Sequence, residues 1–151
     1  TVQAQILELI ARLQQDRGLA VVMITHDLGI VARVAQDVLV MYGGRAAEQA
    51  PVDDLFARPA HPYTRGLLDS LPRLDDRDDE PLRAIPGSPP SLLVPSPGCA
   101  FAPRCPRAAA ATPADRTRCE EVRPAPVPSP GHLVACHLPL HTTAHAREGT
   151  R

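Results

Sequence analysis

Residues 19–28 read LAVVMITHDL, a continuous apolar run that ends in a threonine, a histidine and an aspartate. An apolar run of this length is typical of a parallel strand that is buried on both faces. Open α/β sheets bind ligands just beyond the carboxyl ends of such strands, which is where His26 stands. A neutral imidazole there can donate to a phosphate oxygen or to an attacking water, although a lone histidine at a strand end more often packs or caps. The stretch predicts an α/β fold with His26 as a candidate site residue.

The neighbouring sequence predicts helices around this strand and a hairpin after it. Apolar residues recur at helical spacing before Gly18, which ends the first helix, and Asp27 can cap a second helix. Gly43-Gly44 predicts a tight hairpin turn. The expected elements are, in order, a helix from residue 2 to Gly18, a strand at 19–25, a helix after Asp27, strands at 38–42 and 45–50, a helical turn at 51–57 and a helix from His61-Pro62 to about residue 71.

Composition divides the chain in two. Of 18 prolines, 14 lie between Pro81 and Pro139, so the second part is expected to be loop-rich, without clear periodicity. Residues 1–80 carry a net charge of −5 and residues 81–151 a net charge of +4, neither extreme enough to indicate nucleic acid or an anionic membrane surface. No apolar run reaches the roughly 18 residues of a membrane span, and no signal peptide opens the chain. A soluble, cytosolic protein is expected.

Four cysteines lie within 38 residues of the second part: Cys99, Cys105, Cys119 and Cys136. Two disulfides would suit a secreted module, which the expected cytosolic location disfavours. A Cys₄ zinc site is chemically reasonable, but zinc sites usually contain Cys-x₂₋₄-Cys pairs and none occurs here. An iron–sulfur cluster also needs four thiolates and tolerates several spacings. Four unrelated thiols are the remaining alternative, which their confinement makes less attractive.

Several motifs together resemble the ATP-binding subunits of ABC transporters. TVQAQIL (1–7) with ITHDL (24–28) is similar to the segment that runs from just after the D-loop through the switch-histidine strand, and VMYGGR (40–45) is similar to the hairpin that follows. HPYTRGLL (61–68) narrows the resemblance to the oligopeptide/dipeptide and nickel importer branch. The resemblance covers roughly residues 1–140. It implies the carboxyl-terminal part of an ABC-type P-loop ATPase domain, followed by a Pro-rich, mostly irregular Cys₄ tail.

The resemblance gives His26 the role of the switch histidine, which touches the γ-phosphate and helps to position water. Phosphoryl transfer depends on positioning and charge stabilisation, so this histidine needs partners. The sequence contains no G-x-x-x-x-G-K-[ST] phosphate loop, Walker B acid or signature motif. We therefore expect ATP and Mg²⁺ as cofactors of an intact protein only, and no ATPase activity of this chain alone.

GCAFAPRCP (98–106) and GHLVACH (131–137) resemble the tail of the same branch, which in several members holds a [4Fe–4S] cluster. The resemblance makes the four cysteines the metal ligands, with zinc as the alternative metal. An Ala-rich insert, residues 108–115, separates Cys119 from Cys105; a loop absorbs it at low entropic cost. His132 and His137 rank below the cysteines as ligands, His61 is expected to start a helix, and Arg104 and Arg107 could offset cluster charge.

The expected organisation is a remnant of the nucleotide-binding domain at 1–72, a linker at 73–97, the Cys₄ module at 98–140 and a disordered tail at 141–151. The implied partners are two transmembrane permease subunits and a second ATP-binding subunit at the cytoplasmic face of the membrane, with a periplasmic or lipoprotein peptide-binding protein acting indirectly. Nickel, dipeptides and oligopeptides remain open as cargo. The alternative is a stand-alone Cys₄ metal-binding interaction module without ATPase activity. Nucleic acid is not expected, because the tail has a single aromatic residue, Phe101, for base stacking.

Overall fold

The computed structural model describes residues 2–71, 84–91, 93–129 and 132–141. The chain folds as two compact units, Thr1–Gln36 and Asp37–Arg151. The predicted domain boundaries at 72/73 and 97/98 stay predictions. The acidic run at 75–80 and the predicted disordered tail, apart from His141, lie outside the described residues.

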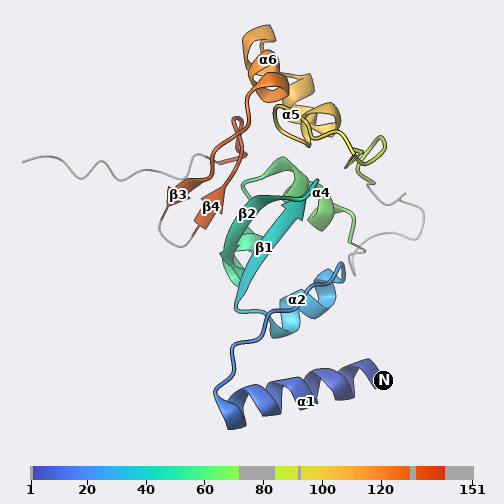
Figure 1. Ribbon diagram of the computed structural model, residues 1–151, viewed down its shortest axis with the longest axis vertical. Coiled ribbons are helices and arrows are strands. Elements are labelled where there is room, and N and C mark those ends of the chain that lie inside the picture. Colours follow the sequence, from blue (N-terminus) through green and yellow to red (C-terminus); the bar gives the residue numbers. More distant parts are fainter. Residues whose placement is uncertain (1, 72–83, 92, 130–131, 142–151) are drawn as a thin grey trace, which may run out of the picture. The chain divides into compact units, whose positions relative to one another are not determined.

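The first unit contains two helices (Figure 1). Helix α1 (Val2–Arg17) ends at Gly18, whose φ of 61° is in the left-handed region that glycine adopts without steric cost. Helix α2 (Leu28–Val34) starts at Asp27, whose Oδ1 accepts hydrogen bonds from the backbone amides of Gly29 at 2.9 Å and Ile30 at 3.1 Å. Both helices, and the capping role of Asp27, agree with the sequence.

The predicted parallel strand at residues 19–25 is not formed. These residues are irregular and exposed, with Val22 at 91% and Ile24 at 96% exposure. A parallel strand takes its hydrogen bonds from neighbouring strands, and the described part of this unit contains no strand with which it could pair. The expectation of a buried parallel strand is therefore wrong for this chain.

The second unit is built on a β-hairpin. Strands β1 (Asp37–Tyr42) and β2 (Arg45–Pro51) pair antiparallel around Gly43 and Gly44, which have φ angles of 55° and 73°. Alternate residues of β1 are buried, so one face of the hairpin packs on the core and the other is open. The hairpin confirms the sequence prediction.

Two short helices follow the hairpin. Helix α3 (Val52–Ala57) buries Leu55 completely, and helix α4 (Pro62–Asp69) begins at His61 with Pro62 in the first turn. Helix α4 ends two residues earlier than the predicted position near residue 71.

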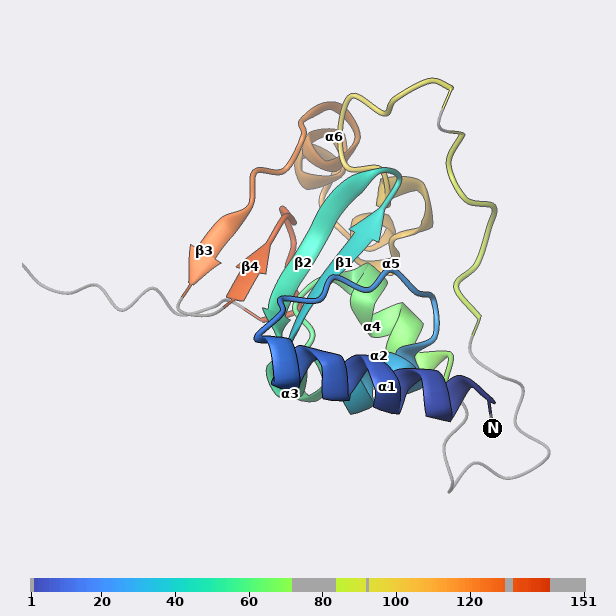
Figure 2. The same cartoon turned by 60° about the horizontal axis from the view of Figure 1, so that its bottom comes forward.

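The tail contains more regular structure than its composition suggests. A 3-10 helix, η1 (Ala102–Arg104), precedes helices α5 (Pro106–Ala109) and α6 (Pro113–Glu121), which contact one another. Strands β3 (Val127–Ser129) and β4 (His132–Val134) then extend the hairpin, giving an antiparallel sheet in the order β1-β2-β4-β3 (Figure 2). The expectation of loops from residue 81 onward missed these elements, including the helical ends of the Ala-rich insert, because each is too short to produce a periodic pattern.

Candidate functional site

His26 lies in an exposed bend between residues 19–25 and α2. The bend is held locally, since the Asp27 amide donates to Thr25 Oγ1 at 3.0 Å before Asp27 caps α2. Within the first unit the imidazole is open to solvent. Its assignment as a catalytic and cofactor-binding residue stays a prediction.

A buried carboxylate organises the second unit. Glu48 lies within β2 and is 1% exposed. Its Oε1 accepts from the Ala60 amide at 2.6 Å, its Oε2 accepts from the His61 amide at 2.9 Å, and His132 Nε2 lies 2.6 Å from Oε1. Because a carboxylate only accepts, Nε2 of His132 carries the proton in this bond. One side chain therefore joins β2, the start of α4 and β4, and we call this set the Glu48 junction.

His61 is a structural residue of this junction, as its position before Pro62 predicted. Its Nδ1 accepts from the Tyr63 amide at 3.0 Å, which caps α4. Burial lowers the pKa of His61 to about 4, against opposing effects of the Glu48 charge and a backbone hydrogen bond with Ala135. The imidazole is therefore neutral at physiological pH, with its proton on Nε2.

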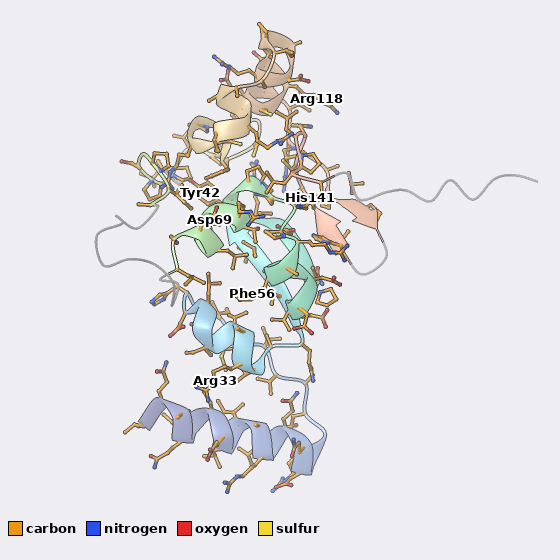
Figure 3. All side chains as sticks on the ribbon, turned by 180° about the vertical axis from the view of Figure 1, so that it is seen from behind. Arg33, Tyr42, Phe56, Asp69, Arg118 and His141 are labelled. Atoms are coloured by element: carbon orange, nitrogen blue, oxygen red, sulfur yellow. The ribbon has the colours of Figure 1, made fainter. Side chains whose placement is uncertain are left out.

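Aromatic rings connect the hairpin to the thiol region. The Tyr42 ring, labelled in Figure 3, lies 4.5 Å from Tyr63 and 5.2 Å from Phe101 between centroids. Arg104 donates to Tyr42 Oη at 3.1 Å and to the backbone oxygens of Ile85 at 3.0 Å and Pro86 at 2.8 Å. Arg104 thus attaches part of the predicted linker to the hairpin, and its suggested role in offsetting the charge of a cluster stays a prediction.

Three of the cysteines pack together. The Cys99 amide donates to the Cys119 oxygen at 2.8 Å, and Cys99 and Cys105 both pack against the core around Cys119, Ala102 and Ala108. Gly98 permits this approach, because a Cβ at that position would overlap the backbone of Cys119 and Glu120. Cysteines distant in sequence thereby pack around one small core.

Cys136 follows β4, and its thiol is within electrostatic reach of the other three. Burial raises the pKa of Cys136 to about 12; a backbone hydrogen bond with Leu138 opposes this shift, and the nearby Cys99, Cys105 and Cys119 charges add to it. Burial also raises the pKa values of Cys99 and Cys119, and neighbouring thiols add to both shifts. All four cysteines are free thiols, and each raised value favours the protonated form when no cation is near.

The donor set fits a thiolate-bound metal in chemistry, whereas the side chains are not in ligating geometry. Among the residues that the structure describes, no three His, Cys, Asp or Glu side chains are grouped closely enough to hold a metal ion. A cation would lower the pKa of every thiol that faces it. Binding of one cation by all four thiolates is therefore consistent with their chemistry.

The two histidines considered as alternative ligands have other partners. His132 binds Glu48, and His137 Nε2 lies 2.7 Å from the Val122 oxygen. Sequence reasoning did not single out Glu48, although a glutamate inside a short strand otherwise rich in alanine is an unusual residue for a buried face. This contrast is the sequence signal from which a structural role of Glu48 could have been predicted.

Cavities of the second unit are small. One of about 110 Å³ lies beside Tyr42, Arg45, Cys99 and Phe101, and one of about 160 Å³ lies beside the hairpin turn and residues 94–96. Both are below the roughly 300 Å³ at which ligand pockets usually begin, so neither accommodates a nucleotide. No helix in the described ranges is both long and apolar enough to cross a membrane.

Comparison with known proteins defines the class to which this arrangement belongs. Residues 47–111 match the family model for the oligopeptide/dipeptide transporter, C-terminal region. This range includes most of the hairpin's return strand, the helix that starts at His61, and two of the cysteines, Cys99 and Cys105.

Curated relatives extend the similarity over most of the chain. The oligopeptide transport ATP-binding protein OppD of Salmonella typhimurium is 46% identical over 140 residues, which is 93% of this chain and 39% of that protein. The dipeptide transport ATP-binding protein DppD of Bacillus subtilis is 46% identical over 147 residues, 97% of this chain and 42% of that protein. A probable peptide ABC transporter ATP-binding protein of Sinorhizobium fredii is 50% identical over 136 residues, 90% of this chain and 39% of that protein.

The chain is therefore similar to the ATP-binding subunits of oligopeptide and dipeptide transporters over more than 90% of its length, and the resemblance drawn from its motifs is confirmed. The chain spans about two-fifths of the length of the curated relatives that it matches. Its mixed helices and antiparallel sheet are consistent with the carboxyl-terminal part of an ABC ATPase domain.

Proposed function

We propose that this chain is the carboxyl-terminal part of an ATP-binding subunit that couples ATP hydrolysis to the import of peptides. The observation that carries the proposal is the similarity of nearly the whole chain to the oligopeptide and dipeptide transport proteins, at 46% identity. The folded HPYT segment adds support, because the Glu48 junction ties it to the hairpin.

In the complete subunit, His26 is the switch histidine. Its exposed imidazole would meet the γ-phosphate of ATP–Mg²⁺, held by a phosphate loop outside this sequence, and would help to orient the attacking water. The subunit would act with a second ATP-binding subunit and with permease subunits at the cytoplasmic face of the membrane, while a binding protein delivers the peptide. Without a phosphate loop and catalytic acid, the chain alone is proposed to be inactive as an ATPase.

A chimera tests this function. Residues 1–141 would replace the matching region of the Salmonella OppD, and peptide-stimulated ATP hydrolysis and peptide uptake would be measured with the cognate transporter. We expect an active chimera, with ATP turnover reduced by about 100-fold in His26→Ala, the usual scale for one group that stabilises a transition state. His141→Ala, which changes an exposed imidazole, is the matched control.

A folded, membrane-bound chimera without uptake or ATPase activity would contradict the proposal. ATP turnover by the 151-residue chain alone that is lost in His26→Ala would contradict its proposed inactivity. An active chimera whose ATP turnover is unchanged by His26→Ala would contradict the role assigned to His26 and leave the proposed transport function standing.

A second proposal concerns the thiol region. The gathering of thiols from separate segments favours a metal centre with Cys99, Cys105, Cys119 and Cys136 as ligands. A [4Fe–4S] cluster is the first candidate and zinc the second. If the phosphate site were never completed, the same centre would make the chain a stand-alone Cys₄ metal-binding interaction module.

Anaerobic purification followed by metal and sulfide analysis separates these alternatives. Iron and sulfide with broad visible absorption would support the cluster, and stoichiometric zinc without iron would replace it. If neither metal is retained or taken up on reconstitution, the metal centre is wrong. Cys119→Ser is the most informative variant, because the insert before Cys119 makes this cysteine the least certain of the four proposed ligands.

A further inference from the structure

Strand β4 is attached to the hairpin by few contacts. It has three residues and pairs with β2 at two positions, Glu48 with Val134 and Gln49 with Leu133. One further backbone bond, from the Ala135 amide to the Ala47 oxygen at 2.9 Å, continues the pairing. A strand this short is held weakly by backbone bonds alone, so its side-chain contacts decide how often it detaches.

One of those contacts is the 2.6 Å bond between Glu48 and His132. The His132 side chain is 13% exposed and that of Glu48 is fully buried, which limits competition from water. Loss of His132 would leave Oε1 of a buried carboxylate with one donor in place of two. The cost of that loss disfavours detachment of β4.

The position of Cys136 follows from the attachment of β4. Cys136 lies two residues beyond β4, whereas Cys99, Cys105 and Cys119 are held by the packing of η1, α5 and α6. After Cys136, the bond of His137 to the Val122 oxygen and the packing of Leu138 against the core around Cys119 hold the chain. Detachment of β4 would therefore release Cys136 on its amino-terminal side and leave the other three thiols in place.

We propose that Glu48 is a positioning residue that fixes β4 to the hairpin through His132 and thereby holds Cys136 beside the other three thiols. The same carboxylate binds the amides of Ala60 and His61, so the start of α4 and the fourth thiol depend on one side chain. The inference concerns the metal-free chain. Only the purpose of holding Cys136 in place, as a metal ligand, rests on the proposed metal centre.

Alkylation of the metal-free chain tests the proposal. The reduced 151-residue chain, kept with a chelator, is treated with iodoacetamide, and modification at Cys136 and Cys119 is followed by mass spectrometry. Cys119 is the internal reference, because it is 6% exposed within α6 and, among the described residues, no hydrogen bond joins it to Glu48, His61 or His132. We expect His132→Ala to raise the ratio of the Cys136 rate to the Cys119 rate by about tenfold, the effect of losing one hydrogen bond to a charged group on local opening.

Two further variants separate positioning from general destabilisation. His132→Gln keeps an amide donor and should return the ratio toward that of the wild type, whereas His141→Ala should leave it unchanged. Glu48→Gln should raise the ratio, because its side-chain NH₂ group would face a backbone N–H donor at a place where a carboxylate oxygen now accepts a hydrogen bond. Glu121→Gln, at an exposed site, should leave the ratio unchanged.

The proposal is overturned if the ratio in His132→Ala stays within about twofold of the wild type. Equal acceleration at both cysteines also overturns it, because the bond would then support the whole unit rather than β4. Metal uptake by the wild-type chain is measured separately. A chain that binds no metal but shows the expected ratio disproves the metal centre and leaves the positioning role intact.

Discussion

The buried His61 imidazole should make the stability of the chain fall in mild acid. Its folded-state pKa of about 4 lies below the ordinary value of 6.5, so the folded chain binds fewer protons than the unfolded chain between these values. The stabilising effect of a neutral His61 is complete above about pH 6.5 and is lost as the pH falls toward 4. His61→Asn removes the titration and keeps a side-chain oxygen that can cap α4.

The size of the effect follows from these two pKa values. Between pH 7 and pH 5.5, proton linkage at His61 lowers the free energy of unfolding by about 1 kcal/mol. His61 is 2% exposed, so solvent screening does not reduce this figure appreciably. With a urea m-value of about 1.5 kcal/mol/M, the unfolding midpoint shifts by about 0.7 M.

Urea unfolding of the metal-free, reduced chain by far-ultraviolet circular dichroism measures the effect. The quantity of interest is the difference in pH dependence between wild type and His61→Asn, because other titrating groups contribute equally to both. His141→Asn should keep the wild-type dependence. If His61→Asn loses stability between pH 7 and pH 5.5 as steeply as the wild type, the assignment of a buried neutral imidazole is wrong.

Three other substitutions probe separate contacts. Gly98→Ala should cost about 1–3 kcal/mol in urea unfolding and expose Cys99 to alkylation, because the added Cβ overlaps the backbone of Cys119; an unchanged midpoint would contradict that close approach. Arg104→Gln should speed proteolysis within residues 84–91 without changing the circular dichroism spectrum, since it releases Ile85 and Pro86; unaltered cleavage would show that other contacts hold the segment. Thr64→Val should be neutral or raise stability by up to about 1 kcal/mol, because the buried hydroxyl has no partner among the described residues; a clear loss would reveal one.

Local chemistry made much of the second unit predictable. Gly43-Gly44 between apolar runs specified the hairpin, and His61-Pro62 specified the start of α4. Asp27 in the first unit was equally informative, because its capping bonds involve the next residues in sequence. In each case the residues that determine the structure are neighbours along the chain.

Features that depend on distant partners were not predictable in the same way. The apolar run before His26 has the composition of a buried strand, but the described chain offers it no strand partner, so composition alone did not produce a strand. Strand β4 forms because β2, more than 80 residues earlier, presents a free edge and Glu48. The grouping of the four cysteines as ligands stays a prediction, and the approach of Cys99 to Cys119 depends on Gly98, whose role appears only in three dimensions.

The strand order β1-β2-β4-β3 also has a consequence for biosynthesis. Residues 52–126 must be made after β2 is complete and before β3 and β4 can leave the ribosome. At about 5–20 residues per second, the outer edge of β2 waits roughly 4–15 s for its neighbour. During that time the edge of β2 is unpaired, and Glu48 lacks its partner His132. The charge on Glu48 then discourages pairing with another nascent chain, so a residue that completes the folded sheet also protects it while it is being made.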